Sequence, residues 1–126
     1  MGAVVVCEGQ LLVVRRGHAP GRGDWSVPGG RVGHGETLSD AVVRELAEET
    51  GLRGVCGDML GWVERIGDGY HFVILDFAVT VATRDVPMAG DDAVEAVWVP
   101  LGAVGDLGLV EGLVDFLSAH GVLPAC

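Results

Sequence analysis

The segment RELAEE, residues 44–49, constrains this chain most, because it crowds three glutamates onto one face of a helix. At about 100° per residue, Glu45 lies three and four positions before Glu48 and Glu49, so the three side chains are neighbours. Each like-charge pair at this spacing costs about 0.2–0.5 kcal/mol, and the negative end of the helix dipole adds to the penalty. A bound cation would reverse both effects. The alternative is a solvated acidic helix end.

The ends of this helix can also be predicted. Thr37 is typical of an N-cap, because its hydroxyl can accept an early backbone N–H, and Asp40 is placed to reciprocate. Gly51 is typical of the left-handed residue that ends a helix. We therefore predict a helix from Leu38 to Thr50.

The acidic face of this helix begins with apolar residues, Leu38 and Ala41. A core-facing helix would continue that apolar stripe, whereas this one changes to carboxylates. Converging hard oxygen ligands favour Mg²⁺ or Mn²⁺. A glycine-rich loop, residues 28–35, precedes the helix and is compatible with close approach of backbone to a ligand or with simple turn geometry.

Arg44 stands one turn before Glu48 on the same helix. Its guanidinium can donate to that carboxylate and orient it without touching a substrate. A surface ion pair, which contributes little stability, is the alternative.

The whole segment 30–52, GRVGHGETLSDAVVRELAEETGL, resembles the signature box of the Nudix hydrolases. The resemblance continues less specifically over residues 4–101, through WSVPGG before the box and WVPL after it. It implies an α/β Nudix fold, an α/β/α sandwich with a mixed β-sheet. Every defining position of the box is filled, by Gly30, Glu36, Arg44, Glu45, Leu46, Glu48, Glu49, Gly51 and Leu52.

Members of this family hydrolyse the diphosphate bridge of nucleoside diphosphates linked to another moiety, with Mg²⁺ or Mn²⁺. By motif position, the resemblance assigns Glu48 and Glu49 as metal ligands and Glu45 as a ligand or water-activating base. Arg44 belongs to the same catalytic set, and the carbonyl of Gly29 is a further candidate metal ligand.

Other acids are candidates outside the box. Some relatives recruit a later acidic loop, and Asp92, upstream of Trp98, is the best candidate here, with Asp91 and Glu95 behind it. A solvated acidic loop is the alternative. Glu64 could replace Glu45 as the general base.

Substrate-binding candidates are fewer. Arg31 and Gly30 adjoin the glycine-rich loop, and guanidinium geometry suits phosphate. Trp25 could stack on a base, although a large aromatic side chain is more often in the core. Tyr70 occupies a position where some dinucleoside polyphosphate hydrolases carry tyrosine, and a strand residue beside a turn explains it equally well. The less favoured alternatives are Arg15, Arg16, Arg22 and Trp98.

The composition bounds the function. We expect one domain, residues 1–126, with a net charge of −10 that disfavours nucleic-acid binding. We find no apolar stretch of about 18 residues and no leader pattern, so we expect a soluble, cytoplasmic protein away from membranes. Its partner would be a nucleotide-type small molecule, and a homodimer is an open alternative.

Apolar patterning predicts the remaining elements. A hairpin is expected over residues 2–7 and 11–15, and a strand with a break at Gly61 over residues 55–66. The nearly continuous apolar run 72–81 predicts a central strand covered on both faces. The last elements expected are a strand at 96–99 and a helix over 109–120 that docks on the sheet.

Two other functions compete with diphosphate hydrolysis of a nucleoside diphosphate derivative such as ADP-ribose or a nucleotide sugar. One is hydrolysis of nucleoside triphosphates, including oxidised ones, to the monophosphate and pyrophosphate, with the same metal site. The other is a non-catalytic nucleotide sensor. Sensors with this fold usually lack acids of the box, and all of them are present here.

Overall fold

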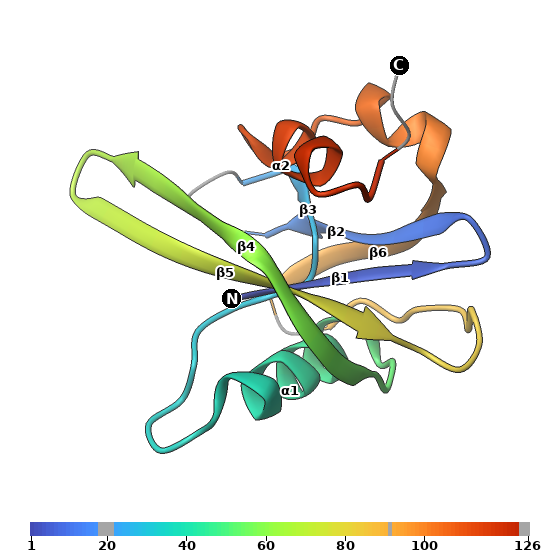
Figure 1. The fold of residues 1–126 in the computed structure, drawn as a ribbon, viewed down its shortest axis with the longest axis horizontal. Helices are drawn as coiled ribbons and strands as arrows, with labels where there is room; N and C mark the ends of the chain where they lie inside the picture. Colours follow the sequence, from blue (N-terminus) through green and yellow to red (C-terminus); the bar gives the residue numbers. More distant parts are fainter. Residues whose placement is uncertain (18–21, 91, 124–126) are drawn as a thin grey trace.

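The computed structural model describes residues 1–17, 22–90 and 92–123. A mixed six-stranded sheet lies between the two α-helices, α1 (Leu38–Thr50) and α2 (Leu113–Ala119) (Figure 1). The predicted α/β/α sandwich is therefore confirmed. The strands are β1 (Gly2–Cys7), β2 (Gln10–Arg16), β3 (Trp25–Ser26), β4 (Val55–Gly67), β5 (Tyr70–Thr80) and β6 (Ala93–Pro100).

The sheet consists of two parts that diverge towards the N-terminal end of β1. In one part, β1 pairs with β5 in parallel, and β5 pairs with β4 in antiparallel orientation. In the other, β2 pairs with β3 and β6. The predicted β1–β2 hairpin is present, but its register comprises Val6 with Leu11 and Cys7 with Gln10, beside the turn. The two strands therefore separate, and the sheet opens.

Residues 28–30 enter the opening between the two parts. The Ala3 N–H donates to the Pro28 carbonyl at 2.7 Å, and the Gly30 N–H donates to the Met1 carbonyl at 3.0 Å. This backbone pairing places the glycine-rich loop beside the start of β1, where the two parts of the sheet have separated.

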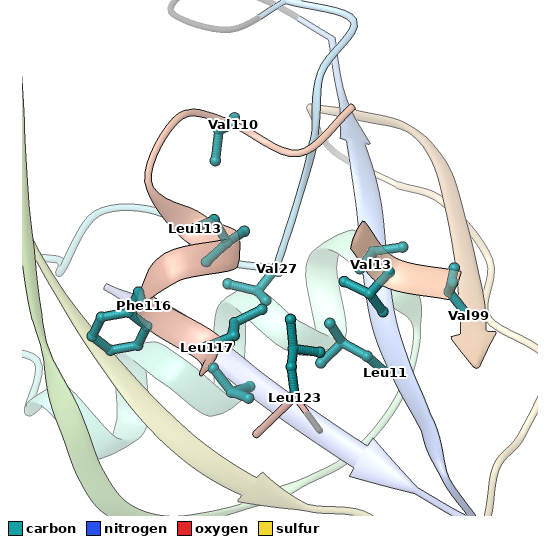
Figure 2. Close-up of a cluster of buried hydrophobic side chains, with 11 residues drawn as sticks. Leu11, Val13, Val27, Val99, Val110, Leu113, Phe116, Leu117 and Leu123 are labelled. Atoms are coloured by element: carbon teal, nitrogen blue, oxygen red, sulfur yellow. The ribbon is translucent and has the colours of Figure 1, made fainter. Parts of the chain in front are cut away.

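Each face of the sheet carries its own apolar core. The cluster under α2 is drawn in Figure 2, where Leu113 and Leu117 point towards side chains of β2 and β6, and Phe116 points towards β4. The cluster on the α1 face includes Val42 and Leu46 of that helix. Because consecutive strand residues point to opposite faces, burial on both sides explains the uninterrupted apolar runs of β1 and β2.

The strand β5 is central, as predicted, but the expectation that both its faces are covered along its whole length is wrong. Its buried residues are Asp76, Phe77 and Val79. Because β4 and β5 are much longer than β1, their shared hairpin extends beyond the rest of the sheet (Figure 1). Trp62 and Val73 are consequently exposed on this hairpin.

The C-terminal elements differ in extent from the prediction. The helix expected over 109–120 begins only at Leu113, because Leu109 bridges to Trp25 of β3 and Gly112 adopts a φ of 85°. Residues Leu101–Asp106 form a 3₁₀ helix, η1, that the apolar pattern did not reveal. β6 starts earlier than expected, at Ala93, because its backbone pairs with β2 as far as Arg16.

The helices in the described part of the chain are all too short, or too polar, to cross a membrane.

Candidate active site

The predicted ends of α1 are confirmed. The Thr37 hydroxyl accepts the Asp40 N–H at 3.1 Å. Gly51 has a φ of 75°, which glycine adopts readily, and its N–H donates to the Ala47 carbonyl at 2.9 Å. Glu45 and Glu49 on this helix are only 8% and 7% exposed, because the face that also carries Val42 and Leu46 packs against the sheet.

The side chain of Arg44 joins the acids of the box into one network. Its Nη1 donates to Glu45 Oε1 at 2.9 Å and to Glu48 Oε2 at 3.0 Å. Nε and Nη2 donate to the two oxygens of Glu36 at 2.7 and 2.9 Å, and Nη2 also donates to the Arg31 carbonyl at 2.9 Å. One permanent cation thus offsets the repulsion among neighbouring acids and fixes the directions of three carboxylates.

Glu36 is a member of this network whose role the sequence argument left undefined. It accepts a bidentate pair of hydrogen bonds from Arg44 and a further bond from the Gly33 N–H at 2.8 Å. The Arg44 hydrogen bond, followed by that from Gly33, holds the pKa of Glu36 below its ordinary value. Its charge therefore anchors the guanidinium to the glycine-rich loop.

The glycine-rich loop touches the helix at two places. The Gly29 N–H donates to Glu49 Oε2 at 2.9 Å. At Gly30, an added Cβ would lie 2.5 Å from the Glu45 carboxyl carbon, which is closer than real Cβ atoms come. Gly30 is therefore required for close approach of the loop backbone to Glu45, and Gly29 lies directly beside the carboxylate of Glu49.

A cavity of roughly 1000 Å³ opens where the two parts of the sheet diverge. It brings together residues from the loop, the helix, the strands and the loop before β6. The predicted site residues on its wall are Gly29, Gly30, Arg31, Glu45, Glu49, Glu64 and Asp92, together with the less favoured Arg16.

Four of the favoured site residues lie outside this wall: Arg44, Glu48, Trp25 and Tyr70. Glu48 is bound to Arg44, and its side chain is 43% exposed. Trp25 packs against the hydrophobic cluster under α2, and the Tyr70 ring lies beside Phe72 with ring centroids 5.4 Å apart. The structure thus places Trp25 with the core, its alternative role, and Tyr70 near the β4–β5 turn. Trp98 also lies elsewhere, with its indole N–H donating to the Asp85 carbonyl at 2.8 Å.

Two arginines on strands, Arg16 of β2 and Arg65 of β4, line the cavity with positive charge. Burial, and then the neighbouring Arg65, lower the pKa of Arg16. A guanidinium nevertheless stays protonated near neutral pH. The cavity therefore contains cationic donors for an anion even though the protein carries a net charge of −10.

The donor set fits a hard divalent cation that shares its ligands with a substrate. Among the described residues, no group of three or more histidine, cysteine, aspartate or glutamate side chains forms a ready cage for a metal ion. Arg44 occupies one oxygen each of Glu45 and Glu48. Mg²⁺ needs no such cage, because it typically binds one or two carboxylates and completes its shell with water and phosphate oxygens. The carboxylates of Glu45 and Glu49 on the cavity wall match that requirement.

Asp76 on β5 is a cavity residue that the sequence argument missed. It is 2% exposed, and its Oδ1 has no hydrogen-bond partner in the described structure. Burial raises the pKa of Asp76 to about 6, and the ammonium group of Met1 partly opposes that shift. The available signal was a single aspartate inside the apolar run VILDFAV.

Comparison with known proteins agrees with this fold. A family model described as NUDIX domain matches residues 1–119, and the chain therefore belongs to the Nudix hydrolase family. The crystal structure of the MutT protein from Methanosarcina mazei Go1 is similar with a TM-score of 0.80 and 27% identity, over 95% of this chain and 89% of that chain.

Two curated relatives show the range of named activities. The ADP-ribose pyrophosphatase of Methanocaldococcus jannaschii is 36% identical over 96 residues, which cover 74% of this chain and 56% of that protein. The 8-oxo-dGDP phosphatase NUDT18 of Homo sapiens is 29% identical over 93 residues, covering 74% of this chain and 29% of that protein. The chain thus spans little more than half the length of the first relative, and less of the second.

Proposed function

We propose that this protein hydrolyses a diphosphate linkage in a nucleoside diphosphate derivative, such as ADP-ribose or a nucleotide sugar, with Mg²⁺ or, as a substitute, Mn²⁺. The observation that carries this proposal is the pair of buried carboxylates, Glu45 and Glu49, on the wall of a cavity large enough for such a ligand. The name of the Methanocaldococcus jannaschii relative supports ADP-ribose as the first substrate to test.

The acids of α1 would hold the metal. Glu49 and Glu45 reach the cavity, and Glu48 extends the acidic face beside them. A bound divalent cation supplies charge neutralisation at the phosphates and lowers the pKa of a coordinated water. Glu45 on the helix and Glu64 on β4 remain the two candidates for the base that takes a proton from the attacking water.

The surrounding residues would position the acids and the substrate. Arg44 holds Glu45 and Glu48 in fixed directions, and the Gly29 N–H does the same for Glu49. Asp92 lines the cavity from the loop before β6, where it could complete the metal site. Arg31, beside Gly30, lines the same cavity and would bind phosphate through its guanidinium.

Hydrolysis of a nucleoside triphosphate is the second candidate. The human relative is named as a phosphatase of an oxidised nucleoside diphosphate, so house-cleaning of oxidised nucleotides has support of the same kind. The acids and the metal would be shared between both reactions. The two differ in the contacts to base and sugar, and in the phosphorus atom that is attacked.

The test is a substrate panel with product analysis. Purified protein is assayed with ADP-ribose, nucleotide sugars, dinucleoside polyphosphates and nucleoside triphosphates, in Mg²⁺, in Mn²⁺ and in excess chelator. We expect turnover that disappears in chelator and returns with either metal. Chromatography of the products identifies the bond cleaved, because a nucleotide sugar gives two monophosphates and a triphosphate gives pyrophosphate.

Matched glutamine variants locate the metal site. We expect Glu49→Gln to lower kcat at least about a hundredfold with the fold intact, because the cavity loses a charged oxygen ligand. Glu8→Gln is the control, since Glu8 is exposed and pairs with Arg84 on the surface. Equal turnover in excess chelator, or normal turnover by Glu49→Gln, would refute the proposed metal site.

A further inference from the structure

Asp76 approaches the cavity from the α2 face of the sheet. It lies opposite Gly61 in the β4–β5 register, and opposite residues share a face. A Cβ at Gly61 would lie 2.8 Å from the ring of His120 and 3.1 Å from that of Phe116, which identifies this face as the one covered by α2. Glu45 and Glu49 come from α1, on the other side of the sheet. Asp76 therefore lies on the opposite face of the sheet from the acids of α1, although the Met1 ammonium interacts electrostatically with both Asp76 and Glu45.

The placement of this carboxyl group is costly for the protein. A buried polar group without a hydrogen bond is strongly unfavourable, and a charged one more so. Oδ1 of Asp76 is such a group, and a Cβ at Gly2 would overlap it. The neighbouring backbone thus leaves room for the carboxyl group without satisfying it. A ligand that donates hydrogen bonds in the cavity would supply the missing partner.

Next to Asp76, the lining of the cavity on this face is mostly apolar, from Val27, Val63, Phe72, Ile74 and Leu113. Arg65, opposite Phe72 in the β4–β5 register, lies on the same face further along the hairpin. An apolar slot with one buried hydrogen-bonding group suits a flat heteroaromatic ring, whose faces are apolar and whose edge carries N–H donors. A phosphate group fits this part of the cavity poorly, because a carboxylate would repel it.

We propose that Asp76 reads the base of the bound nucleotide, by accepting hydrogen bonds from N–H donors at the edge of the nucleobase. The inference rests on the proposed function only in taking the ligand to be a nucleotide. It adds a specificity-determining residue on the α2 face, while the diphosphate lies towards α1. If a ribose hydroxyl were the partner of Asp76 instead, the protein should show no preference among bases.

Binding without turnover tests this assignment. The whole chain is titrated by calorimetry with AMP, GMP, CMP and UMP in excess chelator, so that the outcome is independent of hydrolysis. We expect one base to bind at least about tenfold more tightly than the weakest, since one buried hydrogen bond to a charged group has that effect. In Asp76→Asn, which converts an acceptor into a donor and acceptor of equal shape, the order of the four affinities should change.

The matched control is Asp58→Asn, at an exposed position on β4, which removes the same charge and should preserve the wild-type order. A second comparison needs no variant. Wild-type protein should bind the preferred nucleotide at least about tenfold more tightly than an analogue that lacks its N–H donors.

Three results would overturn the proposal. The first is an unchanged order of affinities in Asp76→Asn. The second is an equal loss for all four nucleotides, which would indicate a structural role or a sugar contact. The third is wild-type protein that binds the donor-free analogue as well as the natural nucleotide. Failure of the proposed hydrolysis with retention of base preference would leave the role of Asp76 intact and remove only the catalytic proposal.

Discussion

At the scale of single residues, the organising group of the site is the guanidinium of Arg44. The sequence predicts a pairing of Arg44 with Glu48 alone, which leaves the repulsion among the three glutamates of RELAEE largely unbalanced. In the folded chain, Arg44 contacts Glu45 and Glu48 and is itself held by Glu36. The fold itself therefore offsets part of the repulsion on the acidic face, and the role we expect for a metal is binding of substrate and chemistry more than stabilisation of the helix.

Replacement of Arg44 tests whether its guanidinium orients the carboxylates that we expect to bind the metal. Lysine keeps the charge but cannot bridge several carboxylates in a fixed plane. We expect Arg44→Lys to raise the metal concentration needed for half-maximal activity about ten- to a hundredfold. The control is Arg84→Lys, which alters a surface pair with Glu8 at 3.2 Å. An unchanged metal-activation curve in Arg44→Lys would show that the network does not position the ligands.

At the scale of elements, the site depends on contact between the glycine-rich loop and α1. The loop is held on one side by backbone pairing with Met1 and Ala3, and on the other by the Glu49 carboxylate. Gly30 has no room for a side chain, because an added Cβ would overlap the carboxylate of Glu45. The backbone of the loop therefore links the start of β1 to the acidic side chains of α1.

A single methyl group should disturb this contact. In Gly30→Ala, the new Cβ would meet the buried Glu45 carboxylate at 2.5–2.6 Å, so the acid must move away from its place on the cavity wall. We expect kcat to fall at least about tenfold, since a misplaced catalytic group has effects of this order, while the melting temperature changes little. Gly102→Ala is the matched control, because nothing lies within 4 Å of a Cβ there. Equal activity of the two variants would contradict the expectation.

At the scale of the whole molecule, the cavity exists because the sheet divides. β1 stays with β5 and β4, whereas β2 stays with β3 and β6. The wall of the opening includes Asp76, a carboxyl group almost completely removed from water. A cavity and an ionisable group in the interior are thus produced by the same division, and the stability of the fold should depend on pH.

The direction of that dependence follows from the pKa of Asp76. Its folded-state pKa of about 6 lies above the ordinary 3.8, so the folded protein binds this proton more tightly than the unfolded chain. The contribution to the free energy of unfolding is therefore full below pH 4 and is lost as pH rises to about 6. The loss amounts to about 3 kcal/mol.

Urea denaturation in chelator, at intervals from pH 4 to pH 7, measures this effect. Asp76→Asn cannot titrate at this position. As pH rises across the range, the free energy of unfolding of the variant minus that of the wild type should therefore increase by about 3 kcal/mol. The exposed Asp58→Asn variant should show no such trend. A constant difference between Asp76→Asn and wild type at every pH would mean that the carboxyl group is not held in its neutral form by burial.

The sequence alone was sufficient for the local features. The bounds of α1 and its caps and the β1–β2 hairpin followed from side-chain spacing and turn residues, and the α/β class and the family followed from the resemblance of residues 30–52 to the Nudix box. These features depend on interactions within a few positions of the chain. The acids of the box could be recognised for the same reason, because one helix places them together.

Only the tertiary structure decided which distant residues meet. Strand register and the opening between β1 and β2 determine three such features: Trp25 lies outside the cavity wall, Glu36 anchors Arg44, and Asp76 lies in the interior. The start of α2 at Leu113 was likewise set by pairing of Leu109 with β3. Long-range backbone pairing and burial leave no periodic signal in the sequence, because the partners are far apart in the chain.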